Sequence, residues 1–576
     1  PFQIFAILTF FLWGSISFVV CYLVPTQDTQ NRKFWGTFAI IILFFVNLLL
    51  ISPVSSTLEK WSQKKAWQGY SIIKTIESPY GRLTLTQEHR ELAVYNNSEL
   101  LFSTTERPLN EENIHTPLLT KISPPKNILM IGGGLGGALE EILKYSSVES
   151  IDYIETDRTL LRYSREYLSR FNFFRDKRVQ ILSKDARQYL NTVSKNYDVI
   201  ISGLSAPETL MFNRFYSLEF FQLCKNHLTS DGIMAFTMPY AESYMGKAML
   251  EFNQLIAKSF QAVFPTVIIW PGTLNHFIGT ASEIPFSTNS WNLVAKMNER
   301  GIRNGYFTPE ALTNLFTPEK VENAQGLLTG ENALPFNNDL KPYAYFYYQI
   351  LWSTYIKSPL NNIFSKTNHI ILYAIFAFFI IYLIYHRLTS SQKNTFIPLA
   401  IFSLGASSMI LQIATIFLFQ ILVGSLYYQI GILILFFMLG LYFGSYQSRK
   451  EFVLGKNIKN NLHLEMLLLF IPVIILSGLT IFSITMLPSW LYIIAIPLIS
   501  YLIGYPVGRT FGIGLRYQYK YIAQPGFLAA IIYSFDIWGG ALTALVTTVL
   551  LLPLIGFIGT IAIASGFLIS AIFLAK

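Results

Sequence analysis

Long runs without a charged side chain divide this sequence into apolar and mixed regions. Residues 394–448 contain no charged residue, nor do residues 466–508, and between Lys520 and Lys576 the only charged residue is Asp536. Because an α-helix crosses the hydrocarbon core of a bilayer in about 20 residues, each long run holds two crossings. The pattern predicts nine membrane-spanning helices, at 4–24, 34–54, 367–386, 395–418, 426–446, 464–486, 489–508, 527–549 and 555–575.

Residues 55–366 are mixed in polarity and show two other patterns of apolar and polar residues. Residues 68–104 form short runs with turn residues at Pro79-Tyr80-Gly81 and Asn96-Asn97, which is typical of a small antiparallel β-unit. From residue 127, apolar runs such as NILMIG and YDVIISGL alternate with amphipathic stretches such as RTLLRYSREYLSRF. This alternation predicts a doubly wound α/β domain, followed by helices at 245–263 and 288–301.

The expected fold class is therefore a polytopic α-helical membrane protein with an inserted α/β Rossmann-like domain, preceded by a small antiparallel β-unit. We expect two transmembrane helices in 1–54, the β-unit in 55–122, the Rossmann-like domain in 123–300, a soluble extension of unassigned fold in 301–366 and about seven transmembrane helices in 367–576. Because the first residue is Pro1 and not methionine, we also expect residues upstream of this numbering.

Composition agrees with this class and argues against two kinds of site. The chain is 52% hydrophobic and only 13% charged, which is too apolar for an ordinary soluble protein. The two cysteines, Cys21 and Cys224, provide neither a disulfide framework nor a cysteine-based metal site, and we predict no metal. We attribute the net charge of +9 to the flanks of the membrane spans. Without a basic stripe interleaved with aromatic residues, nucleic acid is not an expected partner.

The stretch IGGGLGGALEE, residues 131–141, is the first candidate site. A glycine-rich turn between a strand and a helix brings backbone N–H groups and a helix N-terminus against a ligand. The candidate ligand-binding residues in this turn are Gly132, Gly133, Gly134, Gly136 and Gly137.

Two acids follow at the ends of the next predicted strands. Glu155 comes about 20 residues after the glycine turn, where a carboxylate can hydrogen-bond ribose hydroxyl groups. Asp185, in SKDA, is placed to accept a hydrogen bond from an adenine amino group. The alternative interpretation of all three features is a set of tight turns and helix caps without a ligand.

The segment GGGLGGALEEILKYSSVESIDYIETD, with SKDARQYL and YDVIISGLSAP after it, resembles spermidine synthases and related aminopropyltransferases. SPYGRLTL upstream and FNRFYSLEFFQLCKNHLTSDGIMAF downstream extend the resemblance to roughly residues 75–270. The later apolar segments resemble the membrane part of bacterial proteins that fuse transmembrane helices to such a domain. The resemblance implies a class I methyltransferase-type fold and a decarboxylated S-adenosylmethionine donor, with S-adenosylmethionine, methylthioadenosine or an empty site as alternatives.

The acids that the family uses to hold and deprotonate its amine are missing. The resemblance places Gly203 and Ala206 where the family has two aspartates, and Leu135 where it has an acid in the glycine turn. Of the family's Y-H-E element only the histidine remains, as His115 between Ile114 and Thr116. Because an attacking amine must first lose a proton, we predict no catalytic residue for spermidine synthesis.

The distribution of basic residues predicts the orientation of the domain. In a nine-span arrangement, the segments on the face opposite the domain carry Arg32, Lys33, Arg387, Lys393, Arg449, Lys450, Lys456, Lys459, Arg509, Arg516, Lys520 and Lys576. The short loops on the domain's own face, near 419–425, 487–488 and 550–554, carry none, although Lys60, Lys64, Lys65 and Lys366 flank spans there. Because basic residues favour the cytoplasmic face, we expect an integral protein of a bacterial-type inner membrane with an extracytoplasmic domain.

Asp536 lies about nine residues inside a predicted span. An acid at such a depth is costly and is often functional, so Asp536 is a possible intramembrane proton or cation site. A hydrogen-bonded structural acid is the favoured alternative, because no partner acid or base occurs in the other spans. Small residues, namely Gly405, Ala406 and Ser407 in one span and Gly440 and Gly444 in the next, predict close helix packing.

The leading hypothesis is a non-catalytic scaffold or accessory subunit of a membrane assembly, with the bilayer and either other membrane subunits or a second copy of the chain as partners. A membrane-anchored aminopropyl- or methyltransferase that uses an S-adenosyl-type donor is the first alternative. A transporter whose soluble domain senses a polyamine is the second.

Overall fold

The described part of the chain falls into two compact units. These are Pro1–Glu77 with Arg82–Thr105, and Ser78–Gly81 with Glu106–Lys576. The computed structural model describes residues 37, 38, 41, 44 and 45, and residues 53–575 except 90, 242–244, 285, 330–333, 359–366, 368, 390–395, 425–426, 454–461, 482–488 and 519–523. The predicted spans 4–24 and 34–54, and Cys21, lie outside the described residues apart from those few positions.

The first unit contains a helix, α3 (Pro53–Ala66), and the small sheet that the sequence predicts. Its strands lie in the order β1-β2-β3-β4, and β2 pairs with β3, and β3 with β4, in antiparallel fashion. The strands are β1 (Ile72–Ser78), β2 (Gly81–Glu88), β3 (Glu91–Asn96) and β4 (Glu99–Ser103). Asn97 and Ser98 both have positive φ, 49° and 73°, as a two-residue type I′ hairpin turn requires.

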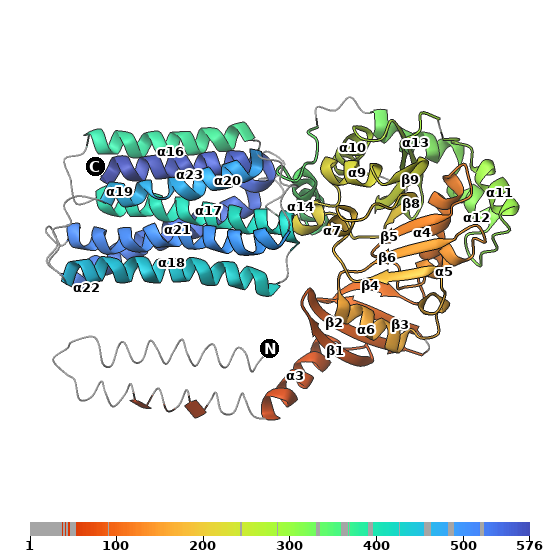
Figure 1. Cartoon of the computed structure of the whole chain (residues 1–576), viewed down its shortest axis with the longest axis horizontal. Coiled ribbons are helices and arrows are strands. Elements are labelled where there is room, and N and C mark those ends of the chain that lie inside the picture. The colour runs from red at the N-terminus through yellow and green to blue at the C-terminus, as the bar shows by residue number, and fades with distance from the viewer. Residues whose placement is uncertain are drawn as a thin grey trace. The chain divides into compact units, whose positions relative to one another are not determined.

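The second unit contains a seven-stranded sheet in the order β10-β11-β9-β8-β5-β6-β7 (Figure 1). Strands β9 to β7 in this order are parallel, and the chain order reverses between β5 and β8, which makes the sheet doubly wound as predicted. The strands are β5 (Asn127–Ile131), β6 (Ser150–Ile154), β7 (Val179–Leu182), β8 (Tyr197–Ser202), β9 (Leu228–Pro239), β10 (Thr266–Pro271) and β11 (Leu274–Thr280). Ligands of such sheets bind beyond the carboxyl ends of the strands at this reversal.

Helices flank this sheet and continue after it. They are α4 (Arg107–Thr120), α5 (Ala138–Leu143), α6 (Arg158–Tyr167), η2 (Asn172–Phe174), α7 (Ala186–Leu190), α8 (Leu210–Asn213), α9 (Leu218–Lys225), α10 (Lys247–Gln261), α11 (Ser290–Glu299), α12 (Pro309–Leu315), α13 (Pro318–Thr329) and α14 (Tyr343–Tyr355). The expected helices at 245–263 and 288–301 are α10 and α11. The antiparallel β10–β11 hairpin was not predicted, and α4 lies with the second unit, although its residues fall in the range expected for the β-unit.

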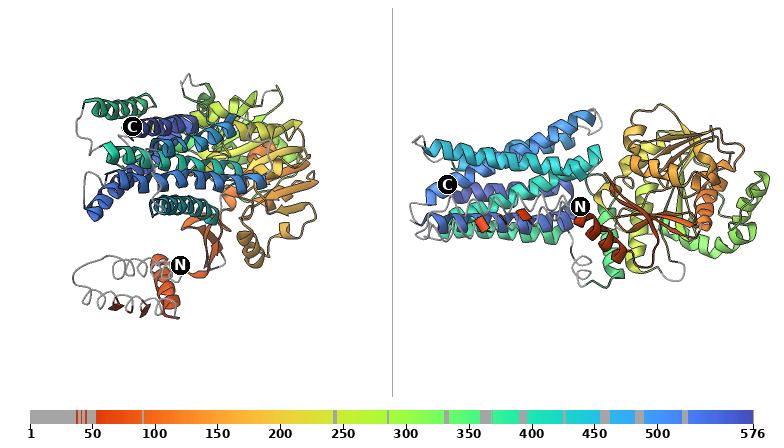
Figure 2. Two further views of the ribbon diagram at one scale, coloured as in Figure 1. Left: turned by 60° about the vertical axis from the view of Figure 1, so that its left-hand side comes forward. Right: turned by 90° about the horizontal axis from the view of Figure 1, so that it is seen from below.

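The remaining helices are apolar and run alongside one another in each view (Figures 1 and 2). They are α16 (His369–Thr389), α17 (Phe396–Val423), α18 (Tyr427–Val453), α19 (Leu462–Leu467), α20 (Phe470–Ile481), α21 (Ser489–Gln518), α22 (Pro525–Val546), η4 (Thr547–Ile555, a π-helix) and α23 (Gly556–Ala575). Within the described residues, six helical segments are long and apolar enough to cross a membrane.

The last of these six segments, Gly526–Ala575, is divided at Gly556. Its 50 residues would extend about 75 Å as one helix, far beyond the roughly 30 Å hydrocarbon core of a bilayer. Gly556 has a φ of +77°, which ends the π-helix, and both α22 and α23 pack against α17. This segment therefore corresponds to the two predicted spans 527–549 and 555–575.

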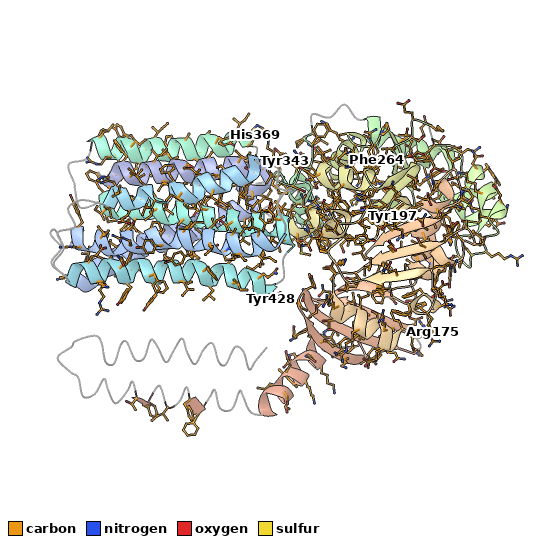
Figure 3. The ribbon with its side chains drawn as sticks, viewed as in Figure 1. Arg175, Tyr197, Phe264, Tyr343, His369 and Tyr428 are labelled. Atoms are coloured by element: carbon orange, nitrogen blue, oxygen red, sulfur yellow. The ribbon has the colours of Figure 1, made fainter. Side chains whose placement is uncertain are left out.

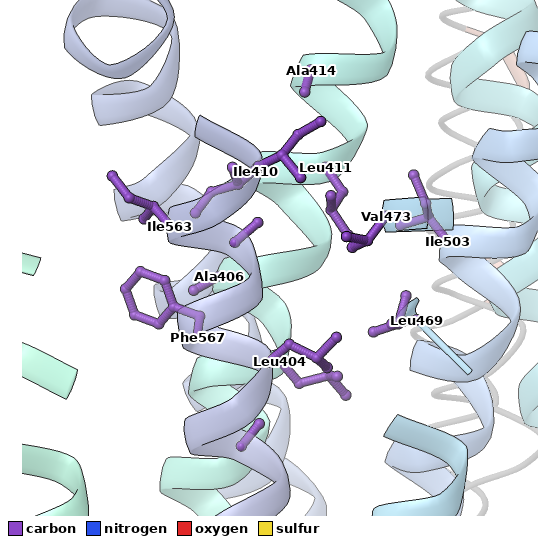
Figure 4. Close-up of a cluster of buried hydrophobic side chains, with 14 of the residues drawn as sticks. Leu404, Ala406, Ile410, Leu411, Ala414, Leu469, Val473, Ile503, Ile563 and Phe567 are labelled. Carbon is purple, nitrogen blue, oxygen red and sulfur yellow. The ribbon is translucent and has the colours of Figure 1, made fainter. Parts of the chain in front are cut away.

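Helix α17 occupies the centre of the apolar core. Its side chains Leu404, Ile410 and Leu411 are almost fully buried, together with Phe567 of α23 and Ile503 of α21 (Figure 4). The Ser407 hydroxyl on the same helix donates a hydrogen bond to the Ala564 carbonyl of α23 over 2.8 Å. Polar and apolar contacts of α17 thus hold the helices around it together.

Helices α18 and α21 meet along a line of glycines. A Cβ atom added at Gly440 would lie 2.5 Å from the Tyr501 carbonyl oxygen, and one at Gly444 would lie 2.1 Å from that of Tyr505. From the other side, a Cβ at Gly504 would lie 2.2 Å from the Phe437 carbonyl oxygen. The predicted close packing at Gly440 and Gly444 is confirmed, and the two backbones touch along this glycine seam.

Candidate functional site

The glycine turn follows β5 at the reversal of the sheet. Gly132 and Gly133 have φ values of +63° and +68°, in the left-handed region that favours glycine. A Cβ at Gly133 would lie 2.7 Å from the Gly203 carbonyl oxygen, and one at Gly132 would lie 2.7 Å from Cδ2 of Leu204. The loop after β8 therefore lies directly on the turn, and the backbone contact with Gly203 requires glycine at position 133.

The remaining glycines of the turn lie against side chains of the same unit. A Cβ at Gly134 would meet the Tyr153 ring at 2.7 Å, and one at Gly137, whose φ is +127°, would meet Asn110 at 3.4 Å. Asn110 also donates a hydrogen bond to the Gly136 carbonyl over 3.1 Å. All five predicted glycines thus line one turn, and their ligand-binding role stays a prediction.

Glu155 lies immediately beyond β6, next to the glycine turn. The Tyr153 hydroxyl donates to one carboxylate oxygen over 3.1 Å, and the Asp157 backbone N–H donates to the other over 3.1 Å. Burial raises the pKa of Glu155 to about 7, despite the hydrogen bond from Asp157 that lowers it. Near neutral pH this side chain is therefore divided between its acid and carboxylate forms, and both forms can bond a ribose hydroxyl group.

Asp185 lies at the next strand end and is the N-cap of α7. One carboxylate oxygen accepts from the backbone N–H groups of Arg187 and Gln188 over 3.1 Å and 3.2 Å. The other oxygen forms an ion pair with the Arg214 guanidinium, whose side chain is only 2% exposed. An adenine amino group would therefore have to compete for a carboxylate that already has three partners, namely the two backbone N–H groups and Arg214.

Arg214 was not predicted as a site residue. Its guanidinium lies 4.6 Å from the Phe215 ring centroid and donates to the Ile421 carbonyl at the end of α17 over 3.4 Å. Gln188 donates in the same way to the Val423 carbonyl over 3.0 Å. The last carbonyl groups of a helix have no partner within the helix, so these two side chains cap the C-terminal end of α17.

The loop after β8, residues 203–209, contains a single acid, Glu208. Gly203 and Ala206 stand where the resemblance places two aspartates. The Tyr216 hydroxyl lies 2.9 Å from the carbonyl oxygens of both Leu204 and Ser205, which fixes the loop over the glycine turn. Leu135 is 1% exposed, so the position of the family's third acid is filled by a core side chain.

His115 takes part in a buried network between α4 and the region of α5. Its Nδ1 lies 2.9 Å from the Tyr145 hydroxyl, and its Nε2 lies 3.0 Å from a carboxylate oxygen of Glu141. Burial lowers the pKa of His115, although the Glu141 carboxylate raises it. These contacts tie α4 to α5, so the histidine has a structural role in this arrangement.

Asp536, in α22, lies against the backbone of α17. A Cβ at Gly405 would lie 2.6 Å from both the carbonyl oxygen and the Oδ1 of Asp536. The glycine therefore provides the space that this acid occupies. Among the described residues, no group of three or more His, Cys, Asp or Glu side chains is arranged to hold a metal ion.

Known proteins match the α/β part of the chain. The spermine/spermidine synthase domain family matches residues 107–289, which include the glycine turn, both acids and the loop after β8. This segment is a spermidine-synthase-like domain. A polyamine aminopropyltransferase of Oceanobacillus iheyensis is 28% identical over 235 residues, which cover 39% of this chain and 45% of the relative. Polyamine aminopropyltransferase 2 of Ralstonia nicotianae is 33% identical over 199 residues, 34% of this chain and 39% of the relative.

The chain spans less than half the length of these two relatives. Among solved structures, a spermidine synthase in complex with the transition-state analogue AdoDATO aligns with a TM-score of 0.38 and 23% identity, over 45% of this chain and 89% of that one. Residues 107–289 hold Glu155 and Asp185 at the ends of β6 and β7, and have Gly203 and Ala206 in the loop after β8.

Proposed function

We propose that this protein is a membrane-embedded, spermidine-synthase-like protein that does not make spermidine and serves as a scaffold or accessory subunit of a membrane assembly. The observation that carries this proposal is the loop at 203–207, which has no carboxylate at Gly203 or Ala206 and lies against the glycine turn. An amine substrate arrives as a cation, and this loop offers it neither an anionic partner nor a general base.

The direct test is an assay of aminopropyl transfer with the full chain in detergent or nanodiscs. Decarboxylated S-adenosylmethionine and putrescine are supplied, and methylthioadenosine release is measured. The Oceanobacillus relative serves as the active control. We expect no release above background, whereas release at a rate comparable to the relative's would overturn the proposal.

The proposed orientation places the domain outside the cytoplasm. Within the described helices, basic residues occupy the last turns of α16, α18 and α21, namely Arg387, Lys450 and Arg516. Reporters fused after Lys576 and in the 447–463 loop test this directly. Cytoplasmic activity at both positions agrees with an extracytoplasmic domain. Exported activity at both would place the domain in the cytosol.

A second candidate is a membrane-anchored aminopropyl- or methyltransferase that uses an S-adenosyl-type donor. It is favoured by Glu155, which lies at the strand end beside the glycine turn and can bond a ribose. Calorimetric titration of the full chain with methylthioadenosine and S-adenosylmethionine distinguishes the two candidates. Binding that is lost in both Glu155→Ala and Asp185→Ala, while thermal melting shows that each variant is still folded, would favour the transferase.

The scaffold role also requires a partner. Native electrophoresis of the protein extracted in mild detergent tests whether it migrates with other membrane subunits or as a multiple of its own mass. A single copy of 65.7 kDa without associated chains would contradict the scaffold role.

A further inference from the structure

A cavity of about 1560 Å³ opens beside Asp185, between the α/β sheet and the ends of the apolar helices. One wall follows the ends of β6 and β7, with Thr156 and Ser183, and continues to Asn191 at the end of α7. The other wall includes residues at the ends of α17 and α20 and at the starts of α18 and α21. Figure 3 labels Tyr428, which lines the cavity from the first turn of α18.

The four acids that line the cavity are each engaged by a partner in the same unit. The Ser78 hydroxyl donates to Asp157 over 2.5 Å, and Arg214 pairs with Asp185. Arg187 pairs with Asp339 over 2.6 Å, and Glu219 accepts from the Asp339 backbone N–H over 3.0 Å. The negative charge of the lining is therefore offset or hydrogen-bonded within the protein itself.

Two basic side chains of the lining have a different environment. Arg158, at the start of α6, and Lys184, after β7, are exposed, and neither forms an ion pair within the described residues. The Lys184 ammonium group lies 5.8 Å from the Tyr189 ring centroid. This ring contact does not neutralise its charge, so the ammonium group can still bind an anion. Arg158 and Lys184 are therefore exposed cations without an ion pair, in a lining that contains four acidic and four basic side chains in all.

The opposite wall is apolar and belongs to helices long enough to cross a membrane. Ile421, Leu422 and Val423 come from α17, and Ile493 comes from α21. Both helices lie within the six membrane-spanning candidates, and Ile493 remains 45% exposed. A ligand with a charged head could thus keep its hydrocarbon chain against these side chains while its head lies at the sheet edge.

We propose that this cavity binds an anionic phospholipid of the surrounding bilayer, with its phosphate group near Arg158 and Lys184 and its acyl chains along α17 and α21. Basic pockets beside transmembrane helices bind acidic lipid headgroups by this combination of charge and apolar surface. The size also agrees, because the cavity exceeds the roughly 300–1,000 Å³ of a typical small-molecule site. The proposal does not depend on whether the domain is catalytic.

The test uses the full chain, purified in detergent and delipidated, and native mass spectrometry to count and titrate bound lipid. The probes are a short-chain phosphatidylglycerol, a short-chain phosphatidylcholine and glycerol phosphate. The charge variant is Arg158→Gln with Lys184→Gln. Its matched control is Arg162→Gln with Lys177→Gln, which removes two exposed charges from the same domain outside the cavity lining. Ile493→Asn tests the apolar wall.

We expect phosphatidylglycerol to bind at least tenfold more tightly than phosphatidylcholine, and the charge variant to lose at least tenfold in affinity while the matched control binds normally. Ile493→Asn should weaken binding of the lipid alone. Equal binding of both lipids, or an unaffected charge variant, would overturn the proposal. So would glycerol phosphate binding as tightly as the lipid, since the ligand would then be a soluble phosphate compound.

Discussion

The Arg214 guanidinium and the Asp185 carboxylate form a buried ion pair at the carboxyl edge of the sheet, with side-chain exposures of 2% and 10%. The sequence suggests Asp185 for an adenine amino group, yet the structure engages it with an arginine that also caps α17. The strand-end position predicted to bind a nucleoside is thus linked through Arg214 to the C-terminal end of α17, one of the helices long and apolar enough to cross a membrane.

Replacing Arg214 with glutamine should destabilise the protein strongly. Removing one partner of a buried ion pair leaves the other charge uncompensated, at a cost of about 3–5 kcal/mol. We expect a clear fall in the thermal midpoint of the full chain in detergent. The double variant Arg214→Gln with Asp185→Asn should recover part of the loss, because no unpaired charge remains. An unchanged midpoint in the single variant would show that the pair contributes little.

Glu155 should make stability depend on pH. Its pKa is raised from 4.5 to about 7 by burial, so the native state holds this proton more tightly than the unfolded chain does. The stabilisation is complete below about pH 4.5 and is lost as the pH rises through about 7, with a total of about 3 kcal/mol.

Glu155→Gln should therefore match the wild type near pH 4 and melt at a higher temperature near pH 8. Thermal melts across this range check the prediction. Glu166→Gln, at an exposed position, serves as the control, and its thermal midpoint should differ from that of the wild type by the same amount at every pH. Parallel melting curves for Glu155→Gln would contradict it.

Gly133 and Gly301 provide a matched pair for testing the glycine turn. Both have positive φ, +68° and +64°, but only Gly133 has a neighbour within reach of a Cβ atom. Gly301→Ala should cost about 1–2 kcal/mol for the backbone conformation alone. Gly133→Ala should cost an additional 1–3 kcal/mol or so for the contact with Gly203. Equal shifts in the two melting midpoints would mean that the loop after β8 moves aside easily.

Restoring the family's two aspartates should not restore spermidine synthesis. A Cβ at Gly203 would lie 2.9 Å from the Gly132 carbonyl oxygen and 3.1 Å from the Gly133 Cα atom, so an aspartate cannot enter without displacing the turn. We expect Gly203→Asp to melt earlier than Ala206→Asp, and the double variant to release no methylthioadenosine. Release by the double variant would show that the two acids alone were missing.

The sequence predicts the parallel part of the sheet well because short, mostly apolar runs alternate there with amphipathic helical stretches. It fails where local pattern is ambiguous. Helix α4 was missed because RPLNEENIHTPLLT contains two prolines and many polar residues, and contacts such as that of His115 with Glu141 of α5 support its helical form. The β10–β11 hairpin was missed although TVIIWP and LNHFIGT are apolar runs separated by two residues.

The strand-end acids were found because their spacing from the glycine turn is regular. Arg214 could not be found in the same way, since its partners lie 29 and 207 residues away along the chain. Long-range ion pairs leave no periodic signal in a single sequence. In contrast, the absence of aspartates at Gly203 and Ala206 is visible in the sequence alone. The structure adds that the backbone of the glycine turn occupies the space that a side chain at position 203 would need.

The glycine seam between α18 and α21 has a mechanical consequence. The two helices contain 27 and 30 residues, or about 40 Å and 45 Å, which exceeds the roughly 30 Å thickness of a hydrocarbon core. Helices of such length adapt to a thinner bilayer by tilting, and backbones in contact cannot tilt separately. The two helices should therefore tilt together as one rigid body. Distances between spin labels on α18 and α21 should then stay constant in bilayers of different thickness.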